Sequence, residues 1–234
     1  MRRVLKCFTF IVRIIIIFFP WKIKRLILNA FYGYELDPKA YIGLSYIYPN
    51  KLIMGPGAEI GHFNVAIHLD LIKMARNTII SQRNWITGFP ATNKNEFQDC
   101  PNRKAYLLME EGSAISKKHH IDCTDIVSIG RYTSIGGYGT QVLTHSTSLK
   151  LNKQMCAPIT IGHNCFIGTR SILLTGSILP DCSVLGAGAV LQKAYTEGYC
   201  LYGGVPAKFI KKLDDSYSFL TRNYRSGQKI IDNE

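Results

Sequence analysis

The sequence predicts an all-β solenoid, in which short parallel strands wind around a narrow apolar interior. Between residues 161 and 191 an aliphatic side chain recurs at every sixth position, and a small residue lies four positions after each of the first five. A helix has a period of about 3.6 and an ordinary strand a period of about 2, so neither element alone explains this spacing. Short strands joined by tight turns do explain it, because each aliphatic side chain then points inward and each small one fits a corner. The aliphatic residues are Ile161, Ile167, Leu173, Leu179, Leu185 and Leu191, and the small residues are Cys165, Ser171, Ser177, Ser183 and Ala189.

Residues 1–40 precede the repeat and have a helical pattern. Positions 4–19 are strongly apolar apart from Arg13 and end at Pro20, and a second basic amphipathic stretch continues to Gly33. A membrane-spanning helix needs about 20 apolar residues, and this run is shorter. Two basic amphipathic helices are typical of an anchor that lies in the headgroup region of a membrane. The alternative is a helical cap that packs on the end of the solenoid.

The predicted solenoid is interrupted twice. From residue 88 to residue 112 the six-residue pattern disappears and polar residues predominate, which predicts a loop. Ile129 and Ile161 are separated by 32 positions, which is not a multiple of six, so the chain has to leave the coil between them, at residues 146–158. Insertions in solenoids map to loops, often on a binding face. We therefore divide the chain into a helical segment, a solenoid, and a C-terminal helix and tail, at residues 1–40, 41–205 and 206–234.

The repeats and the segment that follows them carry a family signature. It consists of hexads of the form Ile-Gly-x-x-Ser-x, then Gly186-Ala187-Gly188, then Gly203-Gly204-Val205-Pro206-Ala207-Lys208. This signature resembles that of the hexapeptide-repeat acyltransferases, specifically from about residue 127 to 212. The resemblance implies a left-handed parallel β-helix that works as a homotrimer and takes an acyl group from acetyl-CoA. The family includes enzymes that O-acetylate bacterial surface sugars.

Composition narrows the choice of partners and compartment. The net charge is +12, but the basic residues are dispersed and no nucleic-acid-binding motif is found, so nucleic acid is not an expected partner. The phosphates of coenzyme A and an anionic membrane surface are anions that suit this charge. The seven cysteines form no C-x-x-C pair, which argues for a reducing compartment and against structural zinc.

His145 is the expected general base. It lies where the coil breaks, ahead of Pro158-Ile159-Thr160-Ile161-Gly162, and the family places its basic histidine in this order. Histidine suits proton abstraction at neutral pH because its ordinary pKa is about 6.5. We expect the imidazole to deprotonate an acceptor hydroxyl, which attacks the thioester directly.

The preceding coil supplies the expected partners of His145. Alignment of the hexads with the family places Ser116, His119 and His120 where acceptors bind. Asp122 is expected to orient the His145 ring as a carboxylate does in a triad, although a backbone carbonyl is an alternative partner. A zinc site built from these histidines is the competing interpretation, since γ-class carbonic anhydrases share the fold. Lys150 and the absence of histidine between residues 145 and 163 disfavour it, and no metal is expected.

The resemblance also implies the coenzyme A contacts. Backbone groups at two turns are expected to hold the pantetheine arm, and three lysines are expected to meet the phosphates as point charges. These positions are Thr169, Ala187, Lys193, Lys208 and Lys211.

The sequence therefore favours a bacterial CoA-dependent O-acetyltransferase that modifies a sugar hydroxyl in surface polysaccharide biosynthesis. The basic N-terminal helices place it in the cytoplasm, peripherally on the inner face of the cytoplasmic membrane. The alternatives are a zinc-dependent lyase of the γ-carbonic-anhydrase kind and a non-catalytic solenoid scaffold at a membrane. The scaffold would need neither His145 nor the C-terminal lysines.

Overall fold

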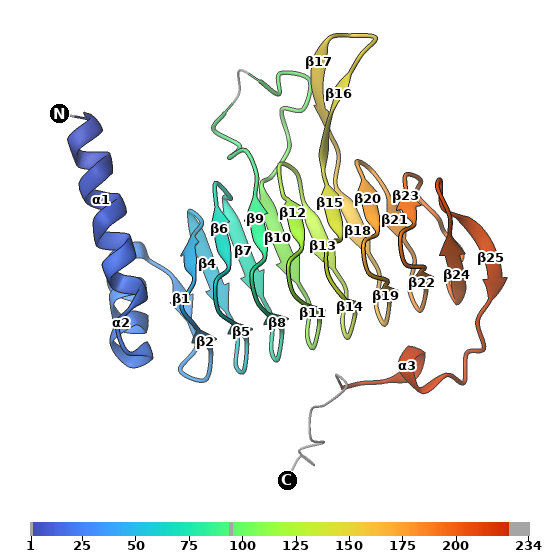
Figure 1. Cartoon of the computed structure of the whole chain (residues 1–234), viewed down its shortest axis with the longest axis horizontal. Helices are drawn as coiled ribbons and strands as arrows, with labels where there is room; N and C mark the ends of the chain where they lie inside the picture. Colours follow the sequence, from blue (N-terminus) through green and yellow to red (C-terminus); the bar gives the residue numbers. More distant parts are fainter. Residues whose placement is uncertain (1, 94–95, 225–234) are drawn as a thin grey trace.

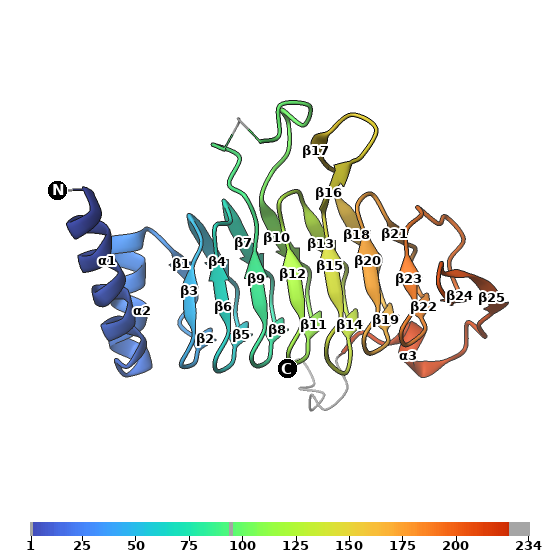
Figure 2. The ribbon, with the colours of Figure 1, turned by 45° about the horizontal axis from the view of Figure 1, so that its top comes forward.

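The computed structural model describes residues 2–93 and 96–224 as a stack of coils with two helices at its N-terminal end (Figures 1 and 2). Three parallel sheets form the faces of the stack, so the predicted solenoid is confirmed. The first face contains β1 (Glu35–Leu36), β4 (Lys51–Met54), β7 (Leu71–Met74), β10 (Tyr106–Met109), β13 (Val127–Ile129), β18 (Ile159–Ile161) and β21 (Ile178–Leu179). The second contains β2 (Tyr41–Ile42), β5 (Glu59–Ile60), β8 (Ile79–Ile80), β11 (Ala114–Ile115), β14 (Ser134–Ile135), β19 (Phe166–Ile167), β22 (Val184–Leu185), β24 (Cys200–Gly203) and β25 (Lys208–Lys212). The third contains β3 (Tyr46–Tyr48), β6 (Val65–Ile67), β9 (Trp85–Thr87), β12 (His120–Asp122), β15 (Gln141–Leu143), β20 (Ile172–Leu174) and β23 (Val190–Leu191).

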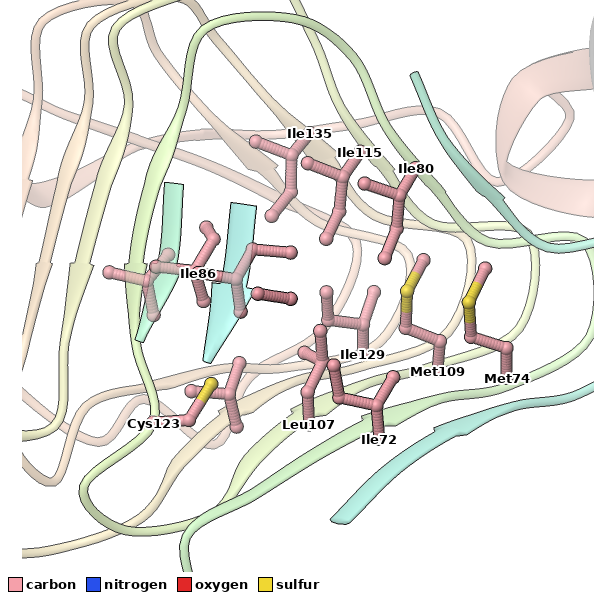
Figure 3. Packing of buried hydrophobic residues seen from close by; sticks show 14 of the residues in the cluster. Ile72, Met74, Ile80, Ile86, Leu107, Met109, Ile115, Cys123, Ile129 and Ile135 are labelled. Atoms are coloured by element: carbon pink, nitrogen blue, oxygen red, sulfur yellow. The ribbon is translucent and has the colours of Figure 1, made fainter. Parts of the chain in front are cut away.

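The interior is the aliphatic column that the hexads predict. All six repeat aliphatics from Ile161 to Leu191 are at most 1% exposed, and the five small residues are equally buried. The register stacks like on like, as in the ladder of Ile80, Ile115 and Ile135 (Figure 3). Each buried aliphatic side chain contributes about 1.5–3 kcal/mol, so the column supplies the main stabilising term of the coils.

Both interruptions leave the stack at the edge where the third face meets the first. The pairing of Ile129 with Ile161 confirms that the chain leaves the coil between them. The first interruption is shorter than the expected 88–112, because Leu107 and Met109 are buried and belong to β10. We call residues 88–105 the excursion. The second interruption is an antiparallel hairpin, β16 (His145–Ser148) and β17 (Lys153–Cys156), and it stands beside the excursion in Figure 1.

The helices α1 (Arg2–Ile17) and α2 (Trp21–Tyr32) cover the first coil. Gly33 ends α2 in the left-handed conformation, with φ of 64°, as expected for a helix stop. Arg13 lies 4.7 Å from the Tyr48 ring centroid, and buried Lys24 donates to the Gly43 carbonyl at 2.6 Å. Both charges therefore point at the coil, and burial lowers the pKa of Lys24 to about 8. Within the described ranges, no helix has the length and apolar character needed to cross a membrane.

The C-terminal segment differs from a simple helix and tail. Residues 208–212 form β25, which pairs antiparallel with β24 because the last coil leaves that strand edge open. Helix α3 (Ser218–Thr221) is a single turn. The segment then folds back over the second face, where Asn164 donates to the Leu220 carbonyl at 2.6 Å.

Candidate functional site

The candidate site centres on His145, the first residue of the hairpin. Asp122 ends the neighbouring strand β12, and its Oδ2 lies 2.8 Å from Nδ1 of His145. The register pairs Asp122 with Leu143, so the carboxylate faces the point where the chain turns out of the coil. Asp122 is 3% exposed, while the His145 side chain is 32% exposed. The carboxylate of the pair is therefore buried, and part of the imidazole is exposed to solvent.

Two threonines hold the carboxylate. Oδ1 accepts the Thr124 hydroxyl at 2.7 Å, and Oδ2 accepts the Thr144 hydroxyl at 2.9 Å and the Thr144 backbone N–H at 3.0 Å. The backbone N–H of His145 adds a further contact at 3.2 Å. Burial alone would raise the pKa of Asp122, but hydrogen bonds from His145, Thr124 and Thr144 more than offset this and the pKa is lowered. The group is an anion at neutral pH.

This anion fixes the state of the imidazole. The hydrogen bond to Asp122 raises the pKa of His145 from its ordinary 6.5, and burial opposes part of the rise. An ionised carboxylate only accepts hydrogen bonds, so Nδ1 carries the proton and Nε2 keeps the lone pair. The arrangement can therefore take a proton at Nε2 from a hydroxyl that approaches the exposed part of the ring.

The excursion adds two aromatic rings that the sequence did not indicate. Phe89 and Phe97 lie with their ring centroids 5.7 and 6.0 Å from that of His145, at interplanar angles of 82° and 88°. We call this pair the aromatic clamp. Its residues lie in a segment without a repeat, so no periodic signal could place them near His145.

The residues expected to contact the acceptor separate into two kinds. His119 is 2% exposed, its Nδ1 accepts the Thr140 backbone N–H at 3.1 Å, and its Nε2 lies 2.9 Å from the Ser116 hydroxyl. Burial lowers the pKa of His119 to about 4, so the ring is neutral. Ser116 in turn donates to the Gly137 carbonyl at 2.7 Å. We therefore assign His119 and Ser116 to the structure of the coil, whereas His120 is exposed on β12.

The expected coenzyme A positions lie on two edges of the stack. Thr169 and Ala187 are at turns between the second and third faces, and the Thr169 hydroxyl donates to the Tyr138 carbonyl at 2.8 Å. Lys193 follows β23 as His145 follows β15, on the same edge and two coils further on, a separation of about 10 Å. Lys208 and Lys211 are exposed on β25, paired with Gly203 and Leu201 of β24. One chain therefore places only Lys193 on the edge of His145.

In the described part of the chain, no group of three or more histidine, cysteine, aspartate or glutamate side chains is close enough to hold a metal ion. The neutral, internally bonded His119 is consistent with a structural rather than a ligand role.

Comparison with known proteins supports the fold and relates the chain to acetyltransferases. Residues 158–193 match the family described as the hexapeptide repeat of succinyl-transferase. The chain is 26% identical over 178 residues to a chloramphenicol acetyltransferase of Agrobacterium fabrum, which covers 66% of this chain and 77% of that protein. It is 35% identical over 68 residues to the galactoside O-acetyltransferase of Escherichia coli, a match that covers 29% of this chain and 33% of that protein. Among solved structures, the polysialic acid O-acetyltransferase OatWY superposes with a TM-score of 0.55 at 15% identity, over 86% of this chain and 90% of that chain, which supports the left-handed β-helix fold.

Proposed function

Because residues 158–193 match the hexapeptide-repeat family, we propose that this chain is a hexapeptide-repeat acyltransferase that transfers an acetyl group from acetyl-CoA to a hydroxyl of a sugar, with His145 as general base. The observation that carries the proposal is the 2.8 Å contact between Nδ1 of His145 and buried Asp122. It leaves Nε2 as the proton acceptor on the exposed side of the ring. The relatives named for galactoside and polysialic acid O-acetylation support a sugar acceptor.

The proposed reaction is a direct transfer. Nε2 of His145 removes the proton of the acceptor hydroxyl as its oxygen attacks the thioester carbonyl carbon. The C–S bond then breaks, the imidazolium returns the proton to the CoA sulfur, and an ester and free CoA are formed. Asp122 keeps the proton on Nδ1 and stabilises the imidazolium, as the carboxylate does in a triad. Proton transfer of this kind contributes about 10²–10⁴-fold to rate.

We further propose that the complete site lies between subunits of a homotrimer. Lys193 shares an edge with His145, but Thr169 and Ala187 lie on the other edge of the third face, across the length of a strand. A neighbouring subunit would bring its own Thr169, Ala187 and Lys208 against this edge. Acetyl-CoA would then lie in the cleft, with its phosphates toward the lysines of the C-terminal coils.

The outer face of the N-terminal helices supports association with an anionic bilayer. Phe8, Ile11 and Ile15 of α1 and Phe18 just after it are between 50% and 69% exposed, and Phe31 of α2 is 82% exposed. The charges of Arg13 and Lys24 point the other way, so the outward stripe is apolar, and Lys22 lies exposed at its margin. An apolar stripe with basic flanks is suited to the headgroup region of a membrane. In this proposal the same helices cap the solenoid with one side and contact lipid with the other.

The experiment for the reaction uses the full-length protein, acetyl-CoA and a panel of glycan acceptors. His145→Ala is expected to lower kcat by about 10²–10⁴-fold, while acetyl-CoA binding stays near that of the wild type. His62→Ala is the matched control, because His62 lies at a coil corner between the second and third faces, far along the chain from the proposed base. Full transfer activity in a folded His145→Ala variant would refute the assignment.

The experiment for the membrane compares vesicles of anionic and neutral lipid. Binding is expected to be stronger with anionic lipid and to fall with salt, since each basic residue near the surface adds about 1 kcal/mol that is screened. Replacing Ile15 and Phe18 by serine is expected to abolish binding, whereas Phe63→Ser, at an exposed ring on a coil corner, should leave it unchanged. Equal binding by all three proteins would contradict the proposal.

A further inference from the structure

The aromatic clamp packs against one side of the His145 ring. Phe89 and Phe97 also contact each other, with centroids 5.4 Å apart, and Phe97 is 2% exposed. Nδ1 of His145 lies 2.8 Å from Asp122 and 3.3 Å from the Thr124 hydroxyl, and contacts at one ring atom leave an imidazole free to rock about that atom. Two rings packed against the same side of the imidazole restrict this rotation and keep water from part of the ring. The clamp is thus suited to hold Nε2 in one direction.

One buried arginine holds the excursion that carries the clamp. Arg103 is 6% exposed, and its guanidinium donates to the carbonyls of Phe89, Pro90 and Asn93, the last two at 2.7 and 2.8 Å. It also lies 4.5 Å from the Phe97 ring centroid. The planar fork of arginine can serve several carbonyls and a ring face at once, which a lysine ammonium cannot do. Arg103 therefore fixes both aromatic residues through one group.

The same guanidinium reaches the coil of the carboxylate. Arg103 donates to the Thr124 carbonyl at 3.1 Å, and the hydroxyl of Thr124 donates to Oδ1 of Asp122 at 2.7 Å. Arg103 therefore contacts both the segment that carries the aromatic clamp and the residue that holds the Asp122 carboxylate. A misplacement of about 1 Å in such a site can cost roughly 10²-fold in rate.

The excursion is also joined to the hairpin that begins with His145. Lys153 forms an ion pair with Asp99 at 2.9 Å, and the backbone N–H of Cys156 lies 3.2 Å from the Cys100 sulfur. Cys156 is the cross-strand partner of His145. The histidine is therefore held between the excursion on one side and a strand attached to that excursion on the other.

We propose that Arg103 is a positioning residue, which holds Phe89 and Phe97 against the imidazole so that Nε2 of His145 is aimed at the acceptor. This inference rests on the proposed role of His145 as base, but the orientation of the ring is measurable without any activity. Asp122 on β12 is the charged group that contacts the ring, and Asp125, Arg103 and the Cys100 thiol lie around Cys156, the cross-strand neighbour of His145.

The first measurement is a proton titration of the His145 ring by NMR in the full-length protein, with the resonance identified by its loss in His145→Gln. The hydrogen bond to Asp122 raises the pKa of His145 and burial opposes part of this rise, so a variant that exposes the ring removes the opposing effect. Arg103→Met and Phe97→Ala are therefore expected to shift the titration to higher pH and to broaden the ring resonances. Arg103→Lys is expected to fall between these variants and the wild type.

The second measurement is acetyl-CoA hydrolysis, with water as the acceptor, followed over pH. Arg103→Met is expected to lower kcat about 10–100-fold with little change in KM for acetyl-CoA, and to move the acidic limb of the profile upward with the NMR titration. Arg83→Met is the matched control, because exposed Arg83 also lies over a phenylalanine, Phe63, at 6.0 Å, but on a different coil corner. It should change neither readout.

Each outcome decides the proposal. If Arg103→Met fails to fold, Phe97→Leu carries the test, since it keeps apolar volume and removes the ring; the same upward shift is expected. An unchanged His145 titration and unchanged hydrolysis in the folded variants overturn the positioning role. If the titration shifts but His145→Ala keeps full transfer activity, the clamp stands and the proposed function fails.

Discussion

Asp122→Asn isolates the charge of the carboxylate with little change in shape. The carboxylate accepts contacts only from donors, which are the backbone and hydroxyl groups of Thr124 and Thr144 and two nitrogens of His145. An amide presents an NH₂ group to at least one of these donors. A buried unsatisfied polar group costs about 1–3 kcal/mol, and breaking a buried ion pair costs about 3–5 kcal/mol. We expect the free energy of unfolding to fall by about 2–5 kcal/mol.

The effect on rate follows from the imidazole tautomer. When the amide NH₂ faces Nδ1, that nitrogen becomes the acceptor, the proton moves to Nε2, and the lone pair needed for general-base catalysis is lost. In a serine-protease triad the equivalent change costs about 10⁴-fold. We expect kcat for acetyl transfer to fall by about 10²–10⁴-fold with a smaller change in KM for acetyl-CoA. Because Asp122 raises the pKa of His145, the remaining activity should have its acidic limb at lower pH.

Asp122 and His145 contribute to the pH dependence of stability with opposite signs. The pKa of Asp122 is lowered on folding, so its contribution to stability is present above the ordinary aspartate pKa and is lost as pH falls through the lowered value. The pKa of His145 is raised, so its contribution is full below about 6.5 and is lost as pH rises through the raised value. Chemical denaturation of the wild type and Asp122→Asn across pH should converge at low pH.

Asp125→Asn separates stability from catalysis. Asp125 is 8% exposed and accepts the backbone N–H groups of Lys104 and Ile126, and within the described residues it makes no hydrogen bond to His145. This control should lose stability while keeping the position of the acidic limb. A folded Asp122→Asn protein with at least half of wild-type kcat would refute the proposal that His145 and Asp122 act as a catalytic dyad.

Two further expectations follow from the coils. Lys193→Ala should raise KM for acetyl-CoA about tenfold with little change in kcat, because it removes one charge-assisted contact to a phosphate. The control variant Lys73→Ala, on the first face, should leave KM unchanged. If steady-state kinetics give equal KM values for the two variants, Lys193 is not part of the site. Leu185→Ala should lower the free energy of unfolding by about 2–5 kcal/mol, measured by denaturant, because Leu185 is fully buried, whereas Val205→Ala at a 74% exposed position should change it little.

The regular coils could be predicted from the sequence, because their side-chain period determines their structure. A residue such as Ile167 must face inward when every sixth position is aliphatic, and the 32-residue gap before Ile161 required a departure from the coil. The pairing of His145 with Asp122 was also predictable in kind, since neighbouring coils stack in register. The six-residue repeat does not continue beyond residue 206. Strand β25 forms because the last coil has an open strand edge, and no local sequence pattern indicates this pairing.

The excursion could not be predicted in the same way. Arg103 is indistinguishable in sequence from a solvated arginine, and only the fold brings four carbonyls around it. His119 shows the reverse case, because a histidine beside His120 looked available for an acceptor, yet its ring nitrogens bond Thr140 and Ser116. Burial and hydrogen bonding, not residue type, decide between these roles.

The position of the dyad follows from the way the chain leaves the stack. Asp122 pairs with Leu143, so a chain that continued into the next coil would turn the following residues into the corner, as Thr144 does with 0% exposure. The hairpin begins instead at His145, which frees its ring while its backbone still bonds Asp122. The hairpin thus keeps the base beside a buried carboxylate and exposes Nε2 at the same time. A longer flexible loop at this point would lose the 2.8 Å contact.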